Sequence, residues 1–137
     1  MGGSMWEKSD VLSNNLFLDE LYFLRQQKGK YLCADFCTQL ENISHKINEE
    51  LCRSFNFKLQ ASVHSQRPEK VSNDFIDRCL ECIENDIHQI LSFKHSPQAL
   101  PKTQISQMLI NISNDLGYLA NHIKFTLNCT NLVPLYL

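Results

Sequence analysis

The sequence predicts an all-α fold, a bundle of about four helices with a long connection between helices two and three. Its clearest feature is a stripe of apolar residues that are spaced alternately four and three positions apart, as on one face of a helix: Ile105, Leu109, Ile112, Leu116, Leu119 and Ile123. Similar stripes recur in three earlier segments. The 137 residues, 43% hydrophobic and 20% charged, are typical of one globular domain with a substantial core. Residues 1–4 resemble the remnant of an expression tag, so the expected single helical domain is 5–137.

The first helix is expected to run to about Gln27. Ser9 or Asp10 can cap its start, because a short polar side chain accepts a hydrogen bond from a free N–H of the first turn. Gly29 is expected to stop it, since glycine adopts a left-handed conformation without steric cost. The turn that follows is short, so helices one and two are expected to be antiparallel neighbours. The apolar positions of the first helix are Leu12, Leu16, Phe17, Leu21 and Leu24.

The second helix is expected from about Lys30 to Phe55, with a charged, solvated face opposite its apolar stripe. That stripe comprises Cys33, Phe36, Leu40, Ile43, Ile47 and Leu51. From Phe57 to Val71 the helical periodicity fails and the sequence becomes polar, with a proline at position 68. This long connection would carry the chain from one end of the bundle to the other, so that the third helix runs parallel to the second.

The third helix is expected to begin after Ser72, an N-cap residue followed by acids that suit the positive end of the helix dipole. Lys94, His95, Ser96 and Pro97 are expected to end it. Its stripe is broad enough to contact two neighbouring helices: Ile76, Cys79, Leu80, Ile83, Ile87, Ile90 and Leu91.

The fourth helix follows Pro101, and we expect it to be the central one. Between positions 102 and 127 the only formal charges are Lys102, Asp115 and Lys124, so the helix is poorly suited to open solvent. Either the rest of the domain or a partner must cover its sides. Beyond Leu127 we expect an extended, apolar end. The candidate partner-binding residues are Gln107, Asn111 and Asn114 on this helix and the terminal Leu135, Tyr136 and Leu137.

Composition and motifs argue against several classes of function. The net charge is −2 and the basic residues are scattered, so no nucleic-acid surface is indicated. No apolar run approaches the roughly 18 residues that cross a membrane. Glycine-rich phosphate loops and common hydrolase motifs are missing, which indicates no enzyme and no cofactor. Cys79 and Cys82, with His88 and His95 nearby, suggest zinc, but both cysteines lie within a predicted helix, so core packing is favoured and no metal is expected.

The six cysteines bear on whether the protein works in a reducing or an oxidising compartment. Spacings of four and three within predicted helices favour free, mostly buried thiols in a reducing compartment, with disulfides or metal as alternatives. Cys129 is expected beyond the last regular helix, where it would be reactive. Three Asn-x-Ser/Thr sequons, at Asn42, Asn111 and Asn128, would matter only in a secreted protein.

These observations favour a non-catalytic, intracellular helical module for protein–protein interaction, in a scaffold or regulatory role and as part of a larger protein. Its partner would be another protein or a second copy of the chain, with no role for nucleic acid or membrane. The alternative is a secreted four-helix ligand of the cytokine type, held by disulfides. Counting free thiols with and without reductant distinguishes the two.

Overall fold

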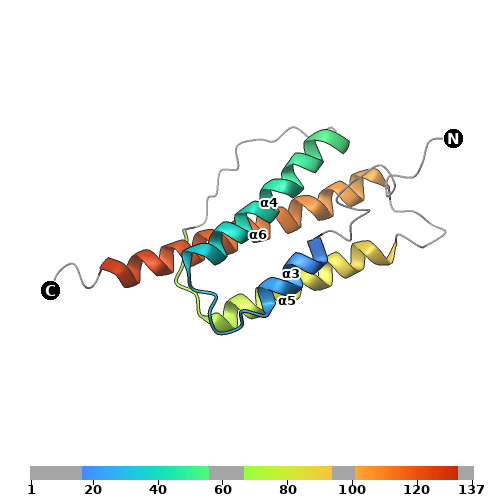
Figure 1. Cartoon of the computed structure of the whole chain (residues 1–137). Helices are drawn as coiled ribbons and strands as arrows, with labels where there is room; N and C mark the ends of the chain where they lie inside the picture. The colour runs from blue at the N-terminus through green and yellow to red at the C-terminus, as the bar shows by residue number, and fades with distance from the viewer. Residues whose placement is uncertain (1–16, 56–66, 94–100, 133–137) are drawn as a thin grey trace.

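The computed structural model describes residues 17–55, 67–93 and 101–132, and within these ranges the chain forms four helices and no strand. The helices are α3 (Leu18–Arg25), α4 (Ala34–Ser54), α5 (Asn73–Ser92) and α6 (Lys102–Leu132). The predicted all-α bundle is therefore confirmed. Figure 1 shows α4 lying along α6 and α3 lying along α5. Among the described helices, none combines the length and apolar character that crossing a membrane requires.

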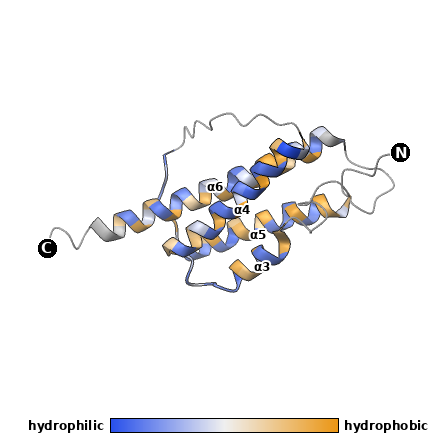
Figure 2. Ribbon diagram, turned by 45° about the horizontal axis from the view of Figure 1, so that its top comes forward, coloured by the Kyte–Doolittle hydropathy of each residue, from blue (hydrophilic) through white to orange (hydrophobic). Residues whose placement is uncertain are grey.

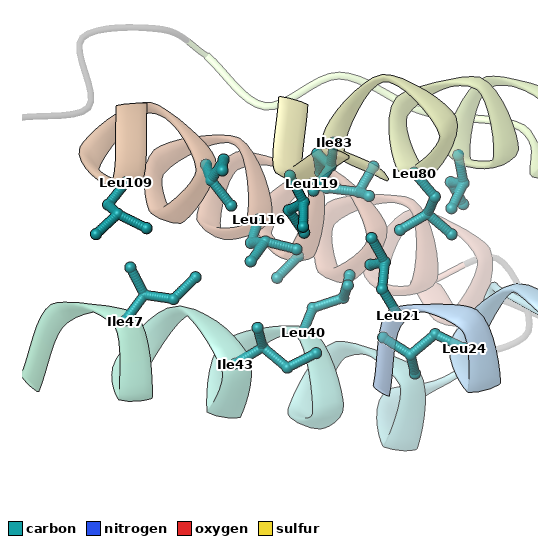
Figure 3. Packing of buried hydrophobic residues seen from close by; sticks show 14 of the residues in the cluster. Leu21, Leu24, Leu40, Ile43, Ile47, Leu80, Ile83, Leu109, Leu116 and Leu119 are labelled. Carbon is teal, nitrogen blue, oxygen red and sulfur yellow. The ribbon is translucent and has the colours of Figure 1, made fainter. Parts of the chain in front are cut away.

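The central helix is α6, which packs against both α4 and α5. All six residues of its predicted stripe are buried, with at most 2% of each exposed. In Figure 3, Leu109 and Leu116 face Ile47 and Ile43 of α4. Every helix carries hydrophilic residues as well, as Figure 2 shows. The stripe thus forms the middle of one hydrophobic core to which all four helices contribute.

Hydrogen bonds between side chains fix the register of α4 against α6. The Ser113 hydroxyl of α6, only 3% exposed, lies 2.7 Å from Oδ1 of Asn48 and 2.9 Å from the Ser44 hydroxyl. The Ser44 hydroxyl also lies 3.1 Å from the Ser113 carbonyl oxygen. A sliding of one helix past the other would leave the buried Ser113 hydroxyl unpaired, which costs about 1–3 kcal/mol.

The first helix differs from expectation in both extent and packing. Phe17 has a left-handed backbone (φ 60°), so α3 begins at Leu18 and ends at Arg25. The proposed caps Ser9 and Asp10 lie outside the described residues. Gly29 has φ 87°, as a stop signal requires. Although α3 and α4 run in opposite directions in Figure 1, α3 packs chiefly on α5.

The second helix begins four residues later than expected, at Ala34. Cys33 is extended (φ −151°, ψ 157°), and its sulfur accepts a hydrogen bond from the Phe36 N–H at 3.4 Å, so it acts as the N-cap. The Tyr31 N–H instead donates to Asn73 Oδ1 at 3.0 Å. Residues 30–33 are thus drawn into contact with α5 and cannot extend α4.

The third helix agrees with expectation at its start, because the Ser72 hydroxyl accepts a hydrogen bond from the Phe75 N–H at 3.2 Å. It ends at Ser92, two residues before the expected stop signal. In Figure 1, α4 and α5 run in the same direction, as the sequence suggested. Positions 56–66 lie outside the described residues, so the length of the irregular connection remains a prediction.

The fourth helix is longer than expected. It continues to Leu132 instead of ending near Leu127, and Cys129 therefore lies within it. The helix can continue because no proline occurs between positions 102 and 133, and a proline disfavours the helical region for the residue before it. Figures 1 and 2 show the last turns of α6 extending past the ends of α4 and α5.

Candidate interaction surface

A groove runs between α5 and α6. Its volume is about 520 Å³, and we call it the α5–α6 groove. Buried Ile83 and Leu119 line it, and Phe75 is 41% exposed beside them. The lining combines apolar, aromatic and charged side chains: Phe75, Arg78, Cys79, Cys82, Ile83, Asp115, Tyr118, Leu119 and His122.

Phe75 lies in the groove because of its position in the helical repeat. The core-facing residues of α5 begin with Ile76, and a helix turns by about 100° per residue, so Phe75 points to the flank beside α6. Its backbone is held in the first turn by the Ser72 cap. An aromatic ring is therefore fixed at the surface of the groove without contributing to the central core.

The charged side chains that line the groove are Arg78 and Asp115. Asp115 of α6 has a raised pKa, because neighbouring atoms displace part of its hydration and because Asp86 of α5 repels its charge. Among the described residues, no cation lies within 4 Å of either carboxylate. Arg78 lies two helical turns before Asp86, and no carboxylate of the described residues lies within 4 Å of its guanidinium group.

His122 connects the groove to the segment that precedes α5. Its Nδ1 accepts a hydrogen bond from the Glu69 N–H at 2.8 Å. One turn later, the Thr126 hydroxyl oxygen accepts a hydrogen bond from the Val71 N–H at 2.9 Å. Residues 69–71 are thus attached to α6 by two backbone donors. A neighbouring hollow of about 320 Å³ also contains Tyr118 and His122, together with Pro68 and Phe125, so the surface continues along α6.

The α5–α6 groove contains two thiols, those of Cys79 and Cys82. Burial raises the pKa of Cys79, and the nearby Cys82 raises it further, so the nucleophilic thiolate is disfavoured. Of the zinc set considered from sequence, His88 Nε2 lies 3.8 Å from Glu84 Oε1, and His95 is outside the described residues. Within the described ranges, no three His, Cys, Asp or Glu side chains are grouped so as to hold a metal ion.

All six cysteines are free, but they are less buried than expected. Only Cys37 is buried, and that burial raises its thiol pKa. Cys52 and Cys82 are exposed, and the other three are half-buried. The expectation of mostly buried thiols was therefore wrong. The reason is that a spacing of three or four places two residues on one face without specifying whether that face is covered.

The partner-binding residues predicted on the last helix are at the surface. Gln107, Asn111 and Asn114 are all exposed, and the Gln107 side-chain N–H donates to Asn111 Oδ1 at 3.1 Å. They lie outside the α5–α6 groove, although Asn111 is one turn before Asp115 of the groove. Leu135, Tyr136 and Leu137 lie outside the described residues, so their role remains a prediction.

Sequence reasoning placed Cys79, Ile83 and Leu119 in apolar stripes but did not identify the groove that they line. Phe75 was overlooked because the stripe of α5 is complete without it, and a large apolar residue outside a complete stripe is the signal that would have identified it. The same signal occurs at Tyr22 and Phe23, which are 65% and 66% exposed on α3. Phe23 borders a second groove, of about 440 Å³, between α3 and α4.

Comparisons of this chain with protein-family models, with curated proteins and with solved structures gave no match.

Proposed function

We propose that this chain is a non-catalytic helical module that binds another protein, in a scaffold or regulatory role and as part of a larger intracellular protein. The α5–α6 groove is the proposed binding surface. The observation that carries the proposal is an apolar groove with the exposed ring of Phe75 beside it. Aromatic side chains in such positions are enriched among residues that dominate binding energy.

The exposed face of α6 supports the same surface. Gln107, Asn111 and Asn114 are exposed and uncharged, although charged residues there would not disturb the core. Interface centres are depleted of charge because burying an unpaired charge is costly. A partner that extends from the groove onto this face would account for the lack of charged residues at these three positions.

The free thiols support an intracellular location. Each of the six cysteines is unpaired, as expected in a reducing compartment. The secreted alternative rests on the sequons, whose asparagines Asn42, Asn111 and Asn128 are all exposed. Titration of the purified, folded protein without reductant distinguishes the two proposals. Six titratable thiols support the intracellular module, whereas protected pairs support the secreted ligand.

The binding proposal is tested by affinity capture from cell lysate with the native chain and two variants. Phe75→Asp places a charge in the groove, and Gln107→Lys places one on the uncharged face. Both positions are exposed, so unchanged helical circular dichroism is expected, together with loss of the captured protein. Phe23→Asp is the matched control, an aromatic residue of greater exposure outside the groove. Equal capture by Phe75→Asp and wild type would refute the assignment of the groove.

A further inference from the structure

Two cysteines on α5 are placed so that one disulfide bond can join them. Cys79 and Cys82 are three residues apart on this helix, and both line the α5–α6 groove. In a regular α-helix that spacing puts the two Cα atoms about 5 Å apart. Disulfides join residues whose Cα atoms are roughly 4.4–6.8 Å apart, so the backbone of α5 already satisfies this requirement.

The two thiols differ in their access to solvent. Cys82 is exposed, whereas Cys79 is half-buried in the groove. Burial raises the pKa of Cys79, and the charge of Cys82 raises it further, so each sulfur lies within the electrostatic reach of the other. An accessible cysteine beside a second, resolving cysteine is a common arrangement at redox-sensitive sites. Cys82 can therefore meet a dissolved disulfide first, and Cys79 can react afterwards within the protein.

We propose that Cys79 and Cys82 form a thiol–disulfide exchange site that reacts with a low-molecular-weight disulfide, for which glutathione disulfide is the probe. The Cys82 thiolate attacks one sulfur of glutathione disulfide, so a mixed disulfide forms, the original S–S bond breaks and one glutathione thiolate leaves. The Cys79 thiolate then attacks Cys82 Sγ and displaces the second glutathione thiolate. The two protons that the cysteines lose end on the two glutathione molecules. The protein dithiol is oxidised by two electrons, and glutathione disulfide is reduced by two.

The geometry of α5 makes the disulfide reversible. Helix side chains at this spacing have Cβ atoms about 5–6 Å apart. A disulfide holds the Cβ atoms at about 3.5–4.5 Å, so α5 must shift locally when the bond forms. Strained and exposed disulfides are more easily reduced than relaxed, structural ones. The site therefore returns to the dithiol when reduced glutathione is in excess.

The other closely spaced pair of cysteines is less accessible. Cys37 is only 1% exposed, and its thiol donates a hydrogen bond to the Ala120 carbonyl oxygen at 3.7 Å. Its neighbour Cys33 is the N-cap of α4, where its sulfur accepts the Phe36 N–H. Cys52 is exposed, but the nearest cysteine in the sequence is fifteen residues away. Cys52 is thus the matched control, an accessible thiol without a second cysteine on the adjacent turn.

The test uses the full chain, reduced and then freed of reductant. The chain is equilibrated with reduced and oxidised glutathione at a fixed ratio, quenched with acid and alkylated, and each cysteine is assigned by peptide mass spectrometry. Two reduced glutathione molecules are released for each internal disulfide, so tenfold dilution of total glutathione should raise the ratio of Cys79–Cys82 disulfide to dithiol about tenfold. The mixed disulfide at Cys52 releases only one, so its ratio to free thiol should not change.

Variants separate the two steps of the reaction. Cys79→Ser removes the second nucleophile, so Cys82 is expected to keep its glutathione and its oxidised fraction should no longer respond to dilution. Cys82→Ser leaves only the half-buried thiol, and loss of modification on α5 is expected. Cys52→Ser is expected to leave the Cys79–Cys82 disulfide and its response to dilution unchanged. Circular dichroism checks that each variant keeps its helices.

Three results for the wild-type chain would overturn the inference. The first is that Cys79 and Cys82 both remain alkylated in a buffer that modifies Cys52. The second is a stable mixed disulfide at Cys82 with Cys79 still free. The third is an α5 disulfide whose ratio to dithiol ignores dilution at fixed glutathione ratio. The inference is independent of the proposed function, because no protein partner takes part in the reaction.

Discussion

Replacing Tyr31 by phenylalanine is expected to loosen the attachment of the segment between α3 and α4 to α5. The Tyr31 side chain is fully buried, and its hydroxyl donates a hydrogen bond to Asp77 Oδ1 at 2.7 Å. A hydrogen bond to a charged group contributes about 1.5–3 kcal/mol. Asp77 keeps two weaker partners in the variant, Lys28 Nζ at 3.7 Å and Arg25 Nε at 3.9 Å, so the lower end applies. We expect a loss of about 1.5 kcal/mol in the free energy of unfolding.

The loss should depend on pH in a defined direction. The hydrogen bond from the Tyr31 hydroxyl is the main cause that lowers the pKa of Asp77 below its usual range. The charges of Lys28 and Arg25 lower it further. A carboxyl with a lowered folded-state pKa contributes stability above its unfolded pKa of about 3.9, and the contribution is lost as pH falls through the folded value. The difference between wild type and Tyr31→Phe should therefore be full at pH 7 and smaller near pH 2.5.

Urea unfolding followed by circular dichroism at the two pH values measures both effects. Tyr22→Phe is the matched control, because it removes the same hydroxyl from a tyrosine that is 65% exposed, and a change below about 0.5 kcal/mol is expected. A Tyr31→Phe loss of the same size at both pH values would refute the assignment of the hydrogen bond to the ionised carboxylate.

Three further predictions concern α6. Gly117→Ala should stabilise the protein by about 0.5–1 kcal/mol in urea unfolding, because an added Cβ meets no atom within 4 Å. Asp115→Asn should raise the thermal midpoint by about 2 °C at pH 7 and leave it unchanged at low pH. The raised pKa of Asp115 means that its ionised carboxylate destabilises the folded state, and at low pH the carboxyl is not ionised. His122→Leu removes the acceptor for the Glu69 N–H, so hydrogen exchange of that amide should accelerate about tenfold while exchange in the α6 core stays unchanged.

The parts of the fold that depend on periodicity could be predicted from the sequence. The stripe from Ile105 to Ile123 is buried as expected, because six apolar residues on one helix face favour packing of that face against other helices. The start of α4 could not be predicted, since the Tyr31 N–H is bound by Asn73, a residue 42 positions away. Cysteine is also an uncommon N-cap, so the local sequence around Cys33 gave no warning.

The candidate site depended still less on local pattern. A groove exists only once two helices are placed side by side, and residues 75–83 and 115–122 belong to segments that no short-range rule connects. Sequence reasoning selected Gln107, Asn111 and Asn114 through the missing charges of α6, but it could not decide whether the domain or a partner covers them. It could not identify Asp86 and Asp115 as neighbours, because their repulsion arises from the packing of α5 on α6.

The shortage of charge on α6 has different causes on its different sides. Toward α4 the core requires it, because Ser113 is buried there and a charged side chain would lose its water without gaining a partner. Toward α5 the penalty of a charge is visible in the raised pKa of Asp115. On the outer face neither reason applies, since Gln107 and Asn114 are exposed and a lysine there would remain hydrated. Folding does not explain neutrality at those positions. The proposed partner would explain it by removing water from them, and on that proposal lysine at Gln107 should weaken binding without affecting stability.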